Sequence, residues 1–95
     1  MKLKKLKIDI KQEHIDAGDG KSPRKCAIAL ALRERGFSAE IFGFGNSYVR
    51  DVGAMTLDDA GRVLDSKCFL NLPVEPCSIE LNRVGPRSMW HIHKY

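Results

Sequence analysis

The chain has 95 residues, of which 43% are hydrophobic and 29% charged, and its formal net charge is +4. This length and balance indicate one soluble globular domain and exclude a disordered, collagen-like or coiled-coil protein. No apolar run approaches the roughly 20 residues of a membrane span, and the basic N-terminus lacks the apolar region of a signal peptide. We therefore expect a cytoplasmic protein whose three cysteines, an odd number, stay reduced.

The first half of the chain carries the clearest signals of local structure. Residues 6–10 alternate apolar and charged side chains, which predicts a half-buried strand, and residues 12–17 predict one helical turn. A helix is predicted over residues 23–35, with Ser22 as its N-cap, Pro23 at its first position and Gly36 just beyond its end. Its apolar run, residues 26–32, indicates the central core helix.

Residues 37–44 and 47–52 are predicted to form two strands of a hairpin that turns at Gly45 and Asn46. The following segment permits a second hairpin or a helix, but Thr56 and Asp59 have the spacing of a capping box, which favours a helix over residues 57–68. Residues 77–81 alternate again and predict a final core strand.

This order of strand, helix, strand, strand, helix and strand predicts an α+β domain over residues 1–82. We expect a ferredoxin-like sandwich, with two helices on one face of an antiparallel sheet. The order also permits a β-grasp-like or looser arrangement. Residues 83–95 form a basic, aromatic C-terminal tail or an additional edge strand.

Two stretches of the chain occur together in a familiar pattern. Residues 8–18 read IDIKQEHIDAG and precede the apolar run that begins at Cys26, while residues 73–81 read PVEPCSIEL. The combination resembles small proteins encoded by phages and prophages, which have a TQEHIxxG start and a VEPFxFEL ending. In that pattern proline often follows the cysteine of the helix and an aromatic residue begins the last strand, where this chain has Ala27 and Cys77. The resemblance implies a phage-borne accessory protein and no particular activity.

Cys26 is the main candidate for chemistry. It opens the core helix after Arg24 and Lys25, and a helix N-terminus with two cations lowers the pKa of a thiol. A nucleophile also needs a base, for which only the three histidines qualify. We prefer the alternative that Cys26 is a small buried hydrophobic side chain, and we therefore predict no catalytic residue.

Four side chains, Cys68, Cys77, His91 and His93, are potential zinc ligands. Their spacing lacks the tight pairs of structural zinc sites, although two histidines on one side of a strand can chelate a metal. We predict no metal and no cofactor, and the sequence leaves open whether these four residues bind one.

Basic residues are spread along the chain, and Trp90 and Tyr95 can act as stacking platforms, so binding of nucleic acid is an alternative. The lysines of the first strand are equally explained as a solvated face that protects a sheet edge. Residues 18–22 read GDGKS but lack the glycine spacing of a nucleotide-binding phosphate loop. A looser anion site at the helix start, with Ser22, Arg24 and Lys25, remains a candidate.

The leading hypothesis is a non-enzymatic phage protein that binds and inhibits a host protein or defence complex, an anti-CRISPR-like anti-defence inhibitor. Aromatic and arginine side chains dominate binding hot spots, so the expected contacts are Arg87, Trp90, His91, His93 and Tyr95. A nucleic-acid-binding module and a cysteine-dependent enzyme are the alternatives. The partner is a host protein or a protein–nucleic-acid complex, no membrane is involved, and the sequence does not specify an oligomeric state.

Overall fold

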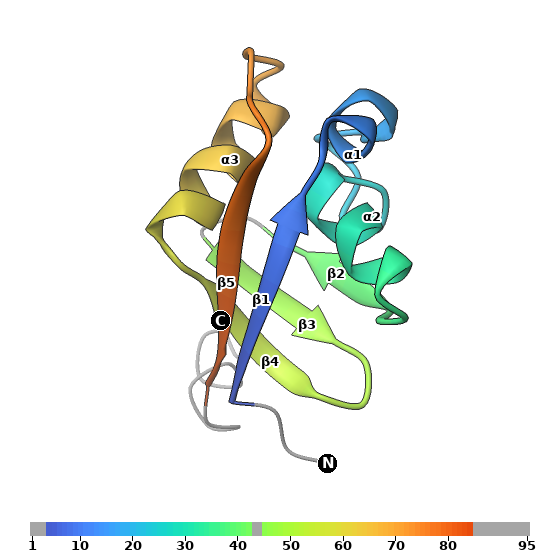
Figure 1. Ribbon diagram of the computed structural model, residues 1–95. Helices are drawn as coiled ribbons and strands as arrows, with labels where there is room; N and C mark the ends of the chain where they lie inside the picture. The colour runs from blue at the N-terminus through green and yellow to red at the C-terminus, as the bar shows by residue number, and fades with distance from the viewer. Residues whose placement is uncertain (1–3, 43–44, 85–95) are drawn as a thin grey trace.

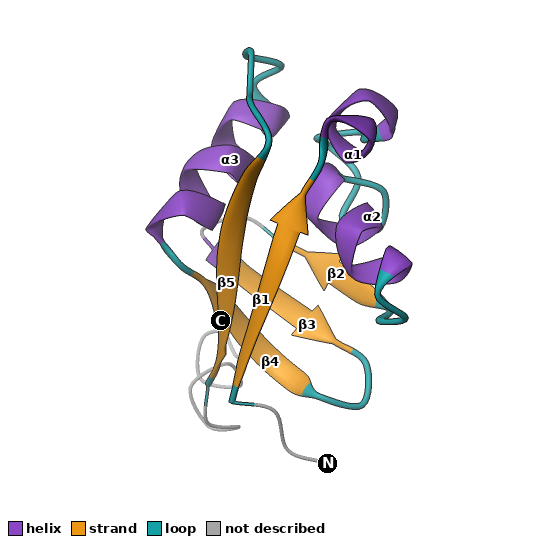
Figure 2. Cartoon of the chain, viewed as in Figure 1, coloured by secondary structure: helices purple, strands orange, loops and turns teal. Residues whose placement is uncertain are grey.

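The computed structural model describes residues 4–42 and 45–84, which form a curled antiparallel sheet and three helices (Figures 1 and 2). The elements follow in the order β1 (Lys5–Ile10), α1 (Gln12–Ala17), α2 (Ala27–Glu34), β2 (Ala39–Ile41), β3 (Asn46–Val49), β4 (Gly53–Leu57), α3 (Asp59–Phe69) and β5 (Cys77–Arg83). The expected α+β class with an antiparallel sheet is confirmed.

The strands lie in the order β1-β5-β4-β3-β2, and every neighbouring pair is antiparallel. β1 pairs with β5 along its whole length, from Lys5 opposite Asn82 to Ile10 opposite Cys77. The two edge strands, β1 and β2, both contact α2. Because the sheet curls, α2 lies across its open side and closes the core (Figure 1).

The core consists of the inward side chains of the strands together with α2. Along β1, Leu6, Ile8 and Ile10 are buried while the residues between them are exposed, which confirms the predicted half-buried strand. Five of the eight residues of α2 are buried, namely Ala27, Ile28, Ala29, Ala31 and Leu32. The helix is therefore central to the core, as the sequence predicted.

The prediction that this helix starts at Pro23 was wrong, because α2 begins at Ala27. Residues 22–26 form a turn in which the carbonyl oxygen of Ser22 accepts the N–H of Cys26 at 3.1 Å. The carbonyl oxygen of Pro23 accepts the N–H of Ile41 at 2.8 Å, which joins the turn to β2. Cys26 is extended, with φ −70° and ψ 166°, and occupies the N-cap position. Ser22 and Pro23 thus mark a turn before the helix rather than its first turn.

The predicted hairpin over residues 37–52 is confirmed by the pairing of β2 with β3, in which Ala39 lies opposite Val49. Both strands are shorter than predicted, and residues 43 and 44 of the turn lie outside the described residues. Beyond β3 the chain turns at Asp51, with φ 67°, and Gly53, with φ 119°, into β4. Strand β4 was not predicted, because glycine, alanine and methionine at its start lack the branched and aromatic bias of strands.

The predicted helix over residues 57–68 is confirmed as α3, with shifted ends. Its N-cap is Asp58, whose side chain accepts the N–H of Gly61 at 2.8 Å, in place of the predicted capping box. A Cβ atom at Gly61 would lie 3.0 Å from Cβ of Leu57. The close approach of α3 to β4 therefore explains a glycine inside this helix.

The specific expectation of a ferredoxin-like sandwich is not confirmed. The observed order βααβββαβ contains an additional strand, β4, and β1 lies at an edge of the sheet. The helical turn predicted over residues 12–17 is present as the separate helix α1. The predicted last strand is β5, which continues to Arg83, and the N–H of Val84 then donates to the carbonyl of Ala54 at 3.1 Å. Within the described ranges, no helix is long and apolar enough to cross a membrane.

Candidate functional site

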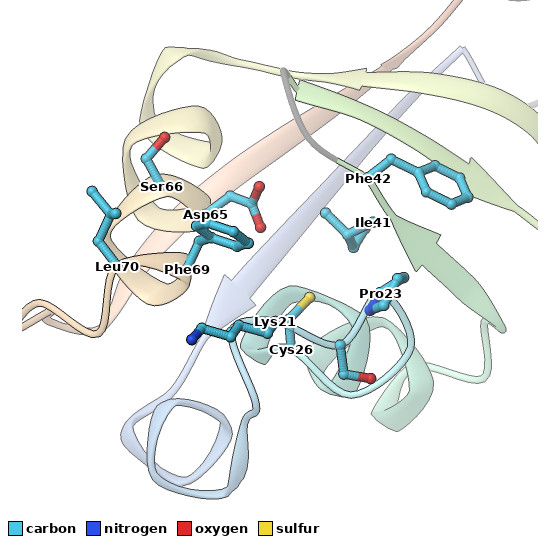
Figure 3. Close-up of a pocket in the computed structure, with 11 residues that line it drawn as sticks. Lys21, Pro23, Cys26, Ile41, Phe42, Asp65, Ser66, Phe69 and Leu70 are labelled. Carbon is cyan, nitrogen blue, oxygen red and sulfur yellow. The ribbon is translucent and has the colours of Figure 1, made fainter. Parts of the chain in front are cut away.

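A pocket of about 530 Å³ opens between the start of α2, the end of β2 and the C-terminal half of α3. We call it the cleft; its lining residues are Gly20, Lys21, Ser22, Pro23, Cys26, Ile41, Phe42, Asp65, Ser66, Phe69 and Leu70. Asp65 and Phe69 extend from α3 toward the opening, and Cys26 and Ile41 face it from the opposite side (Figure 3). The cleft thus brings together segments that are far apart in the sequence.

The loop before α2 forms one wall of the cleft and is fixed against α3 at a single glycine. A Cβ atom added at Gly20 would overlap the carbonyl of Cys68, so only glycine allows this approach of the two backbones. The N–H of Asp19 donates to the carbonyl of Lys25 at 2.8 Å and closes the loop. The cleft therefore has a defined wall in which the backbone is held in place.

Three large apolar side chains that line the cleft remain exposed to solvent. The exposed fractions are 36% for Phe42, 56% for Phe69 and 63% for Leu70. Single exposed apolar residues are common on protein surfaces, whereas a group of them around one concavity marks an interaction site. Phe69 faces the opening and Phe42 and Leu70 lie at its two ends (Figure 3), which makes the cleft the strongest candidate site in the described part of the chain.

Cys26 contributes its thiol to the cleft but is 3% exposed. Burial raises the pKa of this thiol to about 11, a hydrogen bond from the Ala29 backbone counteracts part of that effect, and the charge of Asp65 adds to it. Burial therefore outweighs the lowering that the sequence suggested for a cysteine at a helix start. At neutral pH the side chain is a protonated thiol and a weak nucleophile.

The thiols of the other two cysteines also have raised pKa values. Burial raises the pKa of Cys68, with Asp65 and Cys77 as further causes, and burial also raises the pKa of Cys77. All three cysteines are free thiols. Burial likewise raises the pKa of Asp65, the carboxylic acid of the cleft. The cleft accordingly offers apolar surface and one protonated thiol, that of Cys26, rather than an activated nucleophile.

His14 on α1 is buried, and its two ring nitrogens lie beside Lys11 and Glu34. Its Nδ1 accepts the N–H of Lys11 at 2.9 Å, and its Nε2 lies 3.4 Å from a carboxylate oxygen of Glu34. Because the Lys11 amide donates to the lone pair on Nδ1, this nitrogen is not available as a base. Among the described residues, therefore, no histidine is placed as a base for Cys26.

Glu13, His14 and Glu34 present ligand atoms within 4.8 Å of one another, the spacing of a metal site. The residues fit a metal poorly, because the histidine lone pair is already occupied and Nζ of Lys11 lies 3.3 Å from the Glu34 carboxylate. The ammonium group also holds the pKa of Glu34 below its usual value, mainly through this hydrogen bond. The cluster is an ion-paired contact between α1 and α2.

The sequence-predicted site residues are distributed over several places. Arg87, Trp90, His91, His93 and Tyr95 lie outside the described residues.

Of the candidate anion site, Ser22 lines the cleft, whereas Nε of Arg24 lies 3.4 Å from a carboxylate oxygen of Glu40. Lys25 is exposed on the turn before α2. The structure does not gather these three side chains at one cavity.

Sequence reasoning missed Phe42, Phe69 and Leu70 as site residues. The sequence pattern predicts that an apolar residue at the end of a strand or helix is buried in the core. Only the packed structure shows that these three side chains are exposed to solvent. One signal was available, since Phe69 and Leu70 lie just beyond the predicted end of α3 at residue 68.

Comparisons with protein-family models, with curated proteins and with solved structures found no match to this chain.

Proposed function

We propose that this chain is a non-enzymatic binding protein, and that its cleft receives an apolar side chain of a partner protein. The observation that carries the proposal is the exposure of Phe42, Phe69 and Leu70 around one cavity. A pocket of about 530 Å³ accommodates an aromatic anchor such as phenylalanine, and desolvated aromatic anchors are among the residues that dominate binding energies.

The chemistry of the cleft supports binding rather than catalysis. Its cysteine has a raised pKa, and its carboxylic acid, Asp65, also has a raised pKa because of burial. At neutral pH the Cys26 thiol is protonated and therefore a weak nucleophile. The net charge of +4 favours a partner with an acidic surface around the anchor.

In the biological setting that the sequence resemblance implies, the protein is a phage-borne accessory factor in the host cytoplasm. Its partner would be a host protein or a protein–nucleic-acid defence complex, which it inhibits by occupying a surface. The tail residues Arg87, Trp90, His91, His93 and Tyr95 stay a prediction from sequence for a second part of that contact.

The proposal is tested by affinity capture from a bacterial lysate with the wild-type chain, Phe69→Ala and Val63→Ala. Val63 is a matched control, because it lies on the same helix outside the cleft and is 53% exposed against 56% for Phe69. We expect a stoichiometric protein partner that survives nuclease treatment, is retained by Val63→Ala, and is reduced at least tenfold with Phe69→Ala.

Equal capture by the two variants would show that the partner does not use the cleft. Loss of every partner after nuclease treatment would favour the nucleic-acid-binding alternative. Thermal unfolding of both variants serves as the folding control, and small shifts are expected because both side chains are largely in solvent.

A further inference from the structure

A second concavity, of about 420 Å³, lies at the edge of the sheet formed by β2 and β3, beside α2. Three arginines line it from three segments: Arg24 before α2, Arg33 on α2 and Arg50 after β3. Tyr48 and Glu40 also line this concavity, and we call these five residues the arginine pocket. The pocket shares none of its lining residues with the cleft.

The arginine pocket carries a surplus of positive charge. Arg24 pairs with Glu40, its Nε 3.4 Å from the carboxylate. Arg33 and Arg50 have no ion-pair partner within residues 4–42 and 45–84. Both are exposed, so their guanidinium groups are accessible to an anion. A guanidinium presents a planar fork of donors that matches the oxygens of a phosphate.

The backbone fixes the positions of these side chains. The N–H of Arg50 donates to the carbonyl of Ser38 at 2.8 Å, which extends the β2–β3 pairing by one step. Arg33 lies on α2, which packs against β2. Helix α2 and the end of the β2–β3 pair therefore bring the two unpaired arginines to one pocket.

Tyr48 adds an aromatic surface to this charged site. It is 46% exposed on β3, where it lies opposite Glu40 across the strand pair. An exposed tyrosine ring beside arginines provides a face on which a nucleobase stacks, and such stacking is tolerant of sequence. An acidic peptide would use the arginines but has no need of the ring.

We propose that the arginine pocket binds single-stranded nucleic acid, with Arg33 and Arg50 on a phosphate and Tyr48 stacked on a neighbouring base. The site is separate from the cleft, so this inference does not depend on the proposed protein partner. Basic residues are spread along the sequence, and this inference assigns some of them to one defined binding site. It also fits a partner that is itself a protein–nucleic-acid complex.

The test is fluorescence anisotropy of a labelled oligothymidylate titrated with the full chain at several salt concentrations. Variants are Arg50→Gln, Tyr48→Ala and Tyr48→Phe, with Lys67→Gln as a control that removes one exposed charge on α3, away from the arginine pocket. We expect Arg50→Gln to weaken binding and to reduce the slope of log K against log salt by about 0.7, one phosphate contact. Tyr48→Ala should weaken binding at least about fivefold, whereas Tyr48→Phe, which keeps the ring, should not.

Three results would overturn the inference. The first is no binding of the oligonucleotide at low salt. The second is equal loss of binding with Arg50→Gln and Lys67→Gln, which would indicate unspecific attraction by net charge. The third is unchanged binding with Tyr48→Ala together with equal affinity for a labelled polyglutamate peptide, which would assign the pocket to an acidic peptide instead.

Discussion

The thiol of Cys26 makes the stability of the protein sensitive to alkaline pH. In the unfolded chain this thiol titrates at its ordinary value of 9.0, whereas in the folded protein burial raises its pKa to about 11. Between these values the unfolded state ionises and the folded state does not. The free energy of unfolding is therefore unaffected below pH 9 and falls as the pH rises toward 11.

The magnitude follows from the size of the shift. Each pKa unit corresponds to 1.36 kcal/mol, so the loss attributable to Cys26 is about 1.4 kcal/mol at pH 10 and about 2.7 kcal/mol well above pH 11. Burial also raises the pKa values of Cys68 and Cys77, so other groups add to the alkaline pH dependence. We therefore compare how much the free energy of unfolding falls with pH in the wild-type chain and in Cys26→Ala, which retains all those other groups.

The assay is urea unfolding followed by circular dichroism at pH 8 and pH 10, with a reductant present. Cys26→Ala is expected to be less stable at pH 8 because it leaves a small cavity, but its stability should fall by about 1.4 kcal/mol less than that of the wild-type chain between the two pH values. An equal fall in both proteins would refute the reasoning. It would mean that the thiol ionises in the folded state and that the cleft is open to a reactive cysteine.

The remaining predictions concern reactivity and packing. Iodoacetamide should label Cys26 at neutral pH only after denaturation, as read by mass spectrometry, and rapid labelling of the folded chain would revive the enzyme alternative. Gly20→Ala should lower the free energy of unfolding by about 2–4 kcal/mol, because the added Cβ atom overlaps the carbonyl of Cys68. Gly36→Ala should lower it by only about 1 kcal/mol, because the added Cβ atom meets open space and the cost comes only from the positive φ of 90°. Leu81→Ala on β5, which lies between β1 and β4, should cost about 2–5 kcal/mol in denaturant unfolding, and a cost below 1 kcal/mol would contradict its full burial.

The sequence predicted the elements with strong periodicity and missed those that tertiary contacts decide. The alternation in β1 and the apolar run of α2 identified the two main parts of the core. The start of α2 was placed too early, because the carbonyl of Pro23 bonds to β2 and Cys26 is extended. No local pattern reveals a hydrogen bond to a strand that begins far along the chain.

The candidate site was less accessible to sequence reasoning than the fold. Cys26 was recognised as a candidate, but the balance between the helix N-terminus and burial depends on how deeply the thiol lies. The exposure of Phe69 is a property of how α3 rests on the sheet. The arginine pocket is likewise assembled by β2, β3 and α2, since Arg33 and Arg50 are far apart in the sequence.

The most direct test of the central claim places a photoreactive p-benzoylphenylalanine at Phe69 or at Val63 and irradiates bacteria that express each variant. The substitution keeps an aromatic ring in the cleft, and the two positions have similar exposure on one helix. A binding cleft predicts one discrete crosslinked protein adduct from position 69 that position 63 does not give. Adducts of equal yield from both positions, or none from position 69, would contradict the proposal that the cleft is where a partner protein binds.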